Sequence, residues 1–286
     1  GFEEMRIVRR EVTRGSSRFD FLLEEGGLQH LLEVKSCTLF GRRIAMFPDA
    51  VTSRGRRHLL ELAELARRGT PAHVLFLVGC PHADYFLPDY HTDFAFASAF
   101  LAVRDLVRFH PLAVDWQPDM TPGPNIRKLS IPWSLLERES GDFGCTLLIL
   151  HLPGDVTFSS SGSGRLLFRK GYYVSVDSVH SGLTRRLQSA LRKPAAARVG
   201  GGGVLETLKA AADSRQIIPI RTAEPLEAEL ASAIARVADW TLSTAEFPGE
   251  PAPPRFFGMT DPPLTRRAFV ELLLDFRINR LEKHLS

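Results

Sequence analysis

Two carboxylates and a lysine stand inside otherwise apolar stretches near the start of the chain. Asp20 lies in RFDFLL, residues 18–23, and Glu33 and Lys35 lie in LLEVK, residues 31–35. A charge inside a packed sheet is costly unless it is paired or binds an ion. Side chains two residues apart on a strand point to the same face, so Glu33 and Lys35 project together. Only residues 24–28 separate the two stretches, so we expect a hairpin that brings Asp20 to the same patch.

This grouping suits phosphodiester hydrolysis. Carboxylate oxygens hold Mg²⁺, or Mn²⁺, which keeps other positions for water and phosphate. The cation polarises phosphorus and lowers the pKa of an attacking water, while a lysine orients that water or neutralises developing charge. We predict Asp20 and Glu33 as metal ligands, and Asp20, Glu33 and Lys35 as the catalytic group of a Mg²⁺-dependent nuclease. The alternative is a structural salt bridge among unrelated charges, because Glu-x-Lys alone is a common pattern.

A cluster of cations follows in FPDAVTSRGRRH, residues 47–58. Arg54 and His58 are four residues apart on an expected helix, near its N-terminus, where backbone N–H groups favour phosphate. We predict that DNA, or RNA as the alternative polyanion, is bound by five side chains: Arg18, Arg54, Arg56, Arg57 and His58. The competing interpretation is a solvated first turn with ordinary helix ion pairs, which fits Arg56 and Arg57 better than Arg54 and His58.

The elements that must position these residues form an α/β pattern. Short runs rich in apolar and β-branched residues predict strands at 6–13, 18–24, 29–39 and 74–78. Apolar stripes predict helices at 53–68 and 94–109. Strands followed by helix, strand and helix indicate a mixed sheet flanked by helices.

Prolines at 118, 122, 124 and 132 mark a break, so we expect a first domain at 1–117, a linker at 118–142 and a smaller α/β domain at 143–286. In the second domain the pattern predicts strands at 145–152 and 172–176. It predicts helices at 182–192, 225–240 and 265–285.

Composition sets the class of protein. The 286 residues are 44% hydrophobic and 24% charged, which excludes wholesale disorder. The net charge of +3 decides nothing about partners. Three cysteines fit neither a disulfide framework nor a CxxC metal site, and no apolar run is long enough to span a bilayer. We expect a cytoplasmic protein without membrane association.

His82, His91 and His110 lack metal-ligand spacing and are expected at the surface or in loops.

Four motifs in order resemble the sugar fermentation stimulation protein family, SfsA: REV at 10–12, SRFDFLL at 17–23, EVKSCTL at 33–39 and FPDAVTSRGRRHL at 47–59. The resemblance runs from about Met5 to Trp116. It implies a PD-(D/E)XK nuclease-like fold, DNA binding with little sequence preference, and a nuclease-like site to which Asp20, Glu33 and Lys35 correspond.

The same resemblance leaves a second function open. The family name implies a catalytically silent DNA-binding factor that regulates sugar (maltose) metabolism, although no helix-turn-helix pattern is visible. Family members usually begin with a small OB-like domain, and this sequence starts after it. A further acid from a preceding helix is also missing, and Glu11 is the one upstream substitute.

The second domain resembles a GIY-YIG-like domain of unknown function that is sometimes fused to SfsA. The matching pieces include GCTL at 144–147 and KGYYVSVDS at 170–178. By this resemblance Tyr173, Arg185 and Glu227 stand where such nucleases place a tyrosine, a helical arginine and a metal-binding glutamate. Asp177 replaces the glycine of the second motif, so we expect a degenerate domain.

Overall fold

The computed structural model of the chain describes residues 2, 4–119, 121–160, 164–190, 203–242 and 255–285. It divides into two compact units, each described below by itself. Unit 1 comprises residues 1–140 and 278–286, and unit 2 comprises residues 141–277. No helix of the described residues is both long and apolar enough to cross a membrane.

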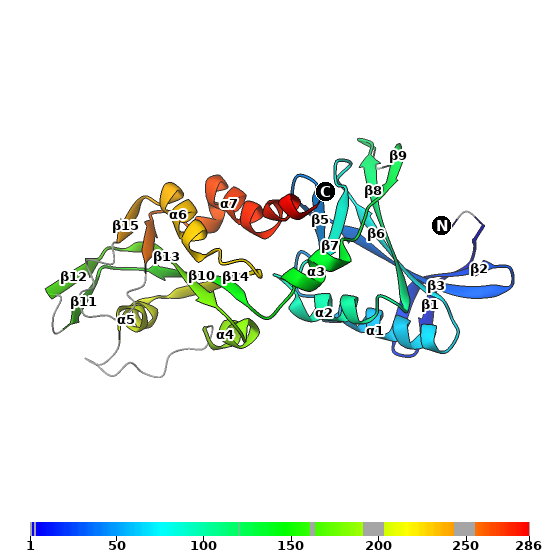
Figure 1. Cartoon of the computed structure of the whole chain (residues 1–286), viewed down its shortest axis with the longest axis horizontal. Coiled ribbons are helices and arrows are strands. Elements are labelled where there is room, and N and C mark those ends of the chain that lie inside the picture. Colours follow the sequence, from blue (N-terminus) through cyan, green and yellow to red (C-terminus); the bar gives the residue numbers. More distant parts are fainter. Residues whose placement is uncertain are drawn as a thin grey trace. The chain divides into compact units, whose positions relative to one another are not determined.

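A six-stranded mixed sheet forms the centre of unit 1 (Figure 1). Its order is β1 (Arg6–Arg14), β2 (Ser17–Glu25), β3 (Leu28–Cys37), β6 (Ala72–Val78), β8 (Val107–Trp116) and β9 (Pro122–Lys128). The first three strands pair antiparallel, β3, β6 and β8 run parallel, and β9 returns antiparallel along β8. The expected mixed α/β class is therefore confirmed.

Helix α1 (Ser53–Arg67) is the element that completes the site. Thr52 caps it by accepting a hydrogen bond from Gly55 N–H at 3.0 Å, which satisfies one of the unpaired amides of the first turn. Its buried face carries Gly55, His58, Leu59, Leu62 and Ala63. Helix α2 (Phe94–Ala102) lies beside it (Figure 1).

Smaller elements close the core of unit 1. They are a three-stranded sheet of β4 (Leu39–Phe40), β5 (Ile44–Phe47) and β7 (Tyr85–Pro88), and helix α3 (Trp133–Glu139). Aromatic rings fill the space between sheet and helices: the centroids of Phe76 and Phe86 lie 4.3 Å apart, and those of Phe100 and Phe109 3.9 Å apart.

Two sequence expectations for unit 1 differ from the structure. The helix expected at 94–109 ends at Ala102, because the chain turns at 103–106 and enters β8. The segment expected as a linker, 118–142, holds β9 and α3. Pro122 is tolerated there because it begins an edge strand, where no partner needs its missing N–H.

Unit 2 is built on a five-stranded antiparallel sheet. Its order is β14 (Ser214–Arg221), β10 (Gly144–Leu152), β13 (Gly171–Val179), β16 (Phe256–Met259) and β15 (Trp240–Leu242). A hairpin of β11 (Val156–Ser160) and β12 (Gly164–Phe168) stands beside it. Alternating residues of β10 enter two cores, one with Leu147 and Ile149 and the other with Leu148 and Leu150.

The helices of unit 2 are α4 (Leu183–Ala190), α5 (Val204–Ala211), α6 (Glu227–Val237), α7 (Arg267–Arg277) and the 3-10 turn η2 (Pro263–Thr265). The helix expected at 265–285 is interrupted, because Ile278 leaves helical backbone angles after α7. The 3-10 segment η3 (Asn279–His284) that follows belongs to unit 1. There the side chain of Asn279 accepts Arg42 N–H, and Arg280 pairs with buried Glu139 at 2.7 Å.

Candidate metal and nucleic-acid site

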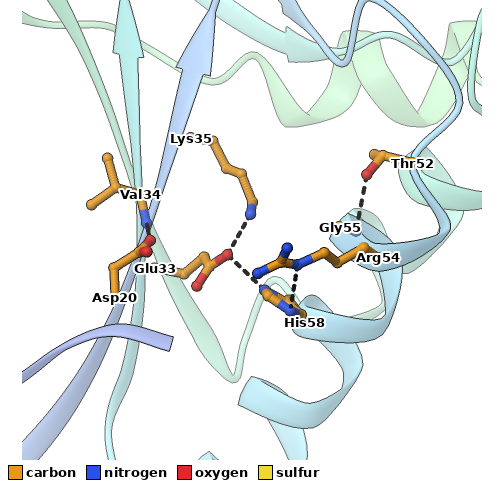
Figure 2. A network of polar contacts seen from close by, with 8 residues as sticks. All are labelled: Asp20, Glu33, Val34, Lys35, Thr52, Arg54, Gly55 and His58. Carbon is orange, nitrogen blue, oxygen red and sulfur yellow. Dashed lines mark hydrogen bonds and ion pairs between the residues drawn. The ribbon is translucent and has the colours of Figure 1, made fainter. Parts of the chain in front are cut away.

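Strands β2 and β3 part in the middle of the sheet. Their backbone pairing runs from Glu25↔Leu28 to Phe21↔Leu32 and then stops. Beyond that point the carboxylate of half-buried Asp20 accepts Val34 N–H at 2.7 Å in place of a backbone carbonyl (Figure 2). The strand break thus brings Asp20 beside the residue that follows Glu33.

Glu33 is a buried carboxylate held through one oxygen. It is 3% exposed, and its Oε1 accepts hydrogen bonds from His58 Nδ1 at 2.6 Å and from Lys35 Nζ (Figure 2). The contact with Lys35 follows from the two-residue repeat of a strand, which places both side chains on one face. Lys35 keeps 18% of its side chain exposed.

The other oxygen of Glu33 has no such partner. Oε2 is buried and makes no hydrogen bond within the described part of the chain. A buried carboxylate oxygen without a partner carries an uncompensated desolvation cost. Cations are the natural complement to that atom.

His58 links Glu33 to Arg54. Arg54 Nε lies 3.4 Å from His58 Nε2, and an arginine N–H can only donate. A carboxylate can only accept, so the pattern fits the tautomer with its proton on Nδ1. Phe19 packs against the imidazole in a T-shaped arrangement, with ring centroids 5.5 Å apart. The ring is thereby fixed between helix and strand.

The predicted DNA-binding side chains divide into two groups. Arg18, Arg54, Arg56 and Arg57 are exposed, whereas His58 is 1% exposed and cannot meet a phosphate directly. Its placement corrects the expected role: His58 contacts Glu33 and Arg54 instead. The upstream Glu11 lies 3.5 Å from Arg18 at the surface and does not join the group around Glu33.

Arg56 and Arg57 line a shallow depression of about 510 Å³ on the outer side of α1. Two carboxylates, Glu61 and Glu64, line the same depression. Their charge offsets the two arginines, whereas Arg54 contacts His58 at the candidate site.

The described residues of the candidate site include two carboxylates, which are too few ligands to surround a cation completely. Within the described ranges there is no group of three or more His, Cys, Asp or Glu side chains with metal-binding geometry. Mg²⁺ is commonly held by one or two carboxylates and keeps several waters. The two carboxylates at the site are that of half-buried Asp20, which accepts Val34 N–H, and that of Glu33, whose Oε2 is unpartnered within the described residues.

The three candidates of unit 2 do not meet. Tyr173 is 1% exposed, donates its hydroxyl to Arg169 O at 2.8 Å and belongs to a hydrophobic core. Arg185 is exposed and lines no described cavity, whereas its neighbour Arg186 pairs with Asp177 at 2.6 Å. Glu227 lines a cavity of about 780 Å³ together with that pair.

Sequence reasoning missed a row of three histidines in unit 1. His30, His73 and His110 come from β3, β6 and β8, and successive ring nitrogens lie 3.0 Å apart. Burial first, and then neighbouring positive charge, lowers the pKa of His73 to about 4. Of the three histidines expected at the surface or in loops, His82 is exposed and His91 lies in a turn, although it is buried. His110 departs from the expectation, because it is half-buried on β8.

A known protein family matches a segment that lies within unit 1. Residues 1–120 match the family model described as "Sugar fermentation stimulation protein RE domain". The resemblance stated from the four motifs is therefore confirmed for this part of the chain.

Similar curated proteins carry the name sugar fermentation stimulation protein homolog. One from Methanothermobacter thermautotrophicus is 38% identical over 135 residues, 46% of this chain and 56% of its own length. One from Clostridium tetani is 42% identical over 110 residues, 38% of this chain and 45% of its own length. The chain thus spans about half the length of these relatives.

A solved structure of Pyrococcus furiosus SfsA in complex with Ca²⁺ is 30% identical. It covers 45% of this chain and 56% of its own chain, with a TM-score of 0.43.

Proposed function

We propose, from the premise that residues 1–120 carry a sugar fermentation stimulation protein RE domain, that unit 1 binds DNA with little sequence preference and cleaves it at a metal-dependent site of the PD-(D/E)XK type. The observation that carries the proposal is the buried Glu33 carboxylate. One of its oxygens is held by Lys35 and His58, and the other has no partner within the described residues.

Asp20 and Glu33 would hold Mg²⁺ or Mn²⁺ at the point where β2 leaves β3. A bound divalent cation supplies Lewis acidity and a water of lowered pKa. Lys35 places a positive charge beside Glu33, where it neutralises charge that develops on a phosphate. His58 fixes the carboxylate so that Oε1 is occupied and Oε2 is left for the cation.

DNA binding would rest on the exposed arginines. Arg54 contacts the buried His58 and is itself exposed, so it can meet a backbone phosphate close to the carboxylates. Arg18 projects from β2, the strand that carries Asp20. Contacts with phosphates alone carry no sequence information, which accounts for weak sequence preference.

Cleavage of supercoiled plasmid and of RNA with Mg²⁺ or Mn²⁺ tests the enzymatic part. We expect nicking by the unaltered chain, and loss of nicking with retained DNA binding for Glu33→Gln and for Lys35→Gln. Glu24→Gln is the matched control, because Glu24 lies on β2 and pairs with Arg6 away from the site. Absence of cleavage on every substrate with both metals would rule out the nuclease.

A second candidate is a catalytically silent DNA-binding factor that regulates sugar (maltose) metabolism. One observation favours it: Glu33 is only 3% exposed and is ion-paired internally, so a phosphate reaches it only if side chains move. In that case DNA binding persists without metal, and Glu33→Gln changes stability and leaves binding as it was.

A further inference from the structure

A cavity of about 980 Å³ opens at an edge of the unit 1 sheet, and neither Glu33 nor Lys35 lines it. The edge belongs to β8. Among the described residues, β9 pairs with β8 only from Leu112 onward, apart from a bond from Leu129 N–H to Pro111 O. The backbone of Val107 to His110 is thus left open on that side, and these residues line the cavity.

One wall of the cavity is aromatic. Phe109 and Trp133 are half-buried, with ring centroids 6.1 Å apart. Phe100 backs both of them in stacked geometry, at 3.9 Å from Phe109 and 5.4 Å from Trp133. Three mutually supporting rings give a firm surface on which a planar group can stack.

The other wall is cationic. Arg108 and Lys128 line the cavity, are exposed, and make no hydrogen bond or ion pair with any residue that the structure describes. Arg104, also at the rim, differs because Glu137 and Asp105 pair with it. Strand alternation sets Arg108 and His110 on one face of β8 and Phe109 on the other, so the cavity wraps around the open edge.

Positive charge at this wall acts on His110. Burial, and next the charge of Lys128 with a contribution from Arg108, lowers the pKa of His110 to about 4. A bound anion would oppose these charges and raise that pKa.

We propose that this cavity binds a nucleotide unit, with its base against Phe109 and Trp133 and its phosphate at Arg108 and Lys128. A nucleotide is flat and aromatic at one end and anionic at the other, which matches the two walls. Base stacking on aromatic side chains combined with cations that meet phosphate is the common mode of nucleotide and single-strand binding. The volume lies in the range of small-molecule sites. The site goes beyond the proposed function, since it shares no residue with the Glu33 group.

The bound nucleotide can be a free nucleotide or the terminal nucleotide of a nucleic-acid strand. Calorimetry with EDTA present would compare AMP, adenosine, inorganic phosphate, and oligonucleotides with and without a 5′-phosphate. AMP is expected to bind more tightly than adenosine or phosphate. A 5′-phosphorylated oligonucleotide that binds more tightly than both AMP and the unphosphorylated oligonucleotide identifies the strand end as the source. Equal binding of the two oligonucleotides, with AMP bound at the cavity, identifies the free nucleotide.

Three variants test the contributions of the cationic wall and the aromatic wall separately. Arg108→Gln and Lys128→Gln should each weaken AMP binding about tenfold, the effect of one lost charge-assisted contact, and leave adenosine unchanged. Trp133→Ala should weaken both ligands. Lys170→Gln, an exposed lysine of unit 2, is the matched control and should change neither affinity.

An NMR titration should show the pKa of His110 rising when AMP is bound.

Failure of all the probes to bind, or AMP affinity that is unchanged in Arg108→Gln and Lys128→Gln proteins of unaltered thermal midpoint, would overturn the proposal. Binding of an extended acidic peptide with no binding of AMP would also overturn it, in favour of strand addition along β8.

Discussion

His58 of α1 places its Nδ1 2.6 Å from Oε1 of Glu33 on β3, and both side chains are buried. The contact joins the helix that carries Arg54 to the strand that carries the candidate metal ligand. A charge-assisted hydrogen bond between two desolvated groups is sensitive to the loss of either partner. The stability of unit 1 and the geometry of the site therefore depend on the same contact.

Replacing His58 by Phe should lower the free energy of unfolding by about 2–3 kcal/mol, because a hydrogen bond to a buried carboxylate is lost and the carboxylate stays. Denaturation in urea measures the change. In Glu33→Gln the buried charge is absent, so His58→Phe should cost less in that background. Equal losses in the two backgrounds would contradict the coupling.

DNA affinity should fall with salt by a log–log slope of about −0.9 per phosphate neutralised. Arg54→Gln should make the slope shallower by about 0.9, because Arg54 is exposed beside the candidate site. Arg67→Gln is the control at the far end of α1, where Arg67 faces Glu64. Binding titrations at several salt concentrations give the slopes. A slope in Arg54→Gln equal to that of the unaltered chain would remove Arg54 from the interface.

The histidine row predicts a pH dependence of stability. The pKa of His73 is lowered from 6.5 to about 4 by burial and then by His110, His30 and Arg108. The unfolded chain therefore binds more protons than the folded chain between these values, so stability is complete above about pH 6.5 and falls as the pH drops toward 4. The shift corresponds to about 3 kcal/mol.

His73→Leu should flatten that part of the stability profile, measured by urea denaturation from pH 7 to pH 4. His82→Leu, at an exposed position, should leave the profile as it is. A profile in His73→Leu with the original slope would show that other groups cause the acid sensitivity.

Local patterns predicted the contact between Glu33 and Lys35, because strand periodicity alone places them together. The sequence also allows the burial of His58 to be predicted, since His58 lies next to Leu59 and one turn before Leu62 on the buried face of α1. Its choice as a phosphate ligand followed its position four residues after Arg54 near the helix N-terminus, and the structure buries that position.

Other features had no local signal. The histidine row joins positions 30, 73 and 110 through the parallel pairing of β3, β6 and β8. The register between strands that are distant in the sequence cannot be predicted from the residues of any one strand. In unit 2 Arg185 is exposed, and Arg186, which follows it about 100° further around the helix, pairs with Asp177.

Tyr173→Phe tests whether the tyrosine of unit 2 takes part in catalysis. The hydroxyl is buried and donates to Arg169 O, and burial raises the pKa of the phenol, which stays protonated at neutral pH. Removing one such hydrogen bond should lower the free energy of unfolding by about 1 kcal/mol and leave any DNA cleavage unchanged. Glu227→Gln, which alters the exposed glutamate at the unit 2 cavity, is the companion variant. Loss of cleavage in Tyr173→Phe, with cleavage retained in Glu33→Gln and the fold intact, would transfer the active site from unit 1 to unit 2.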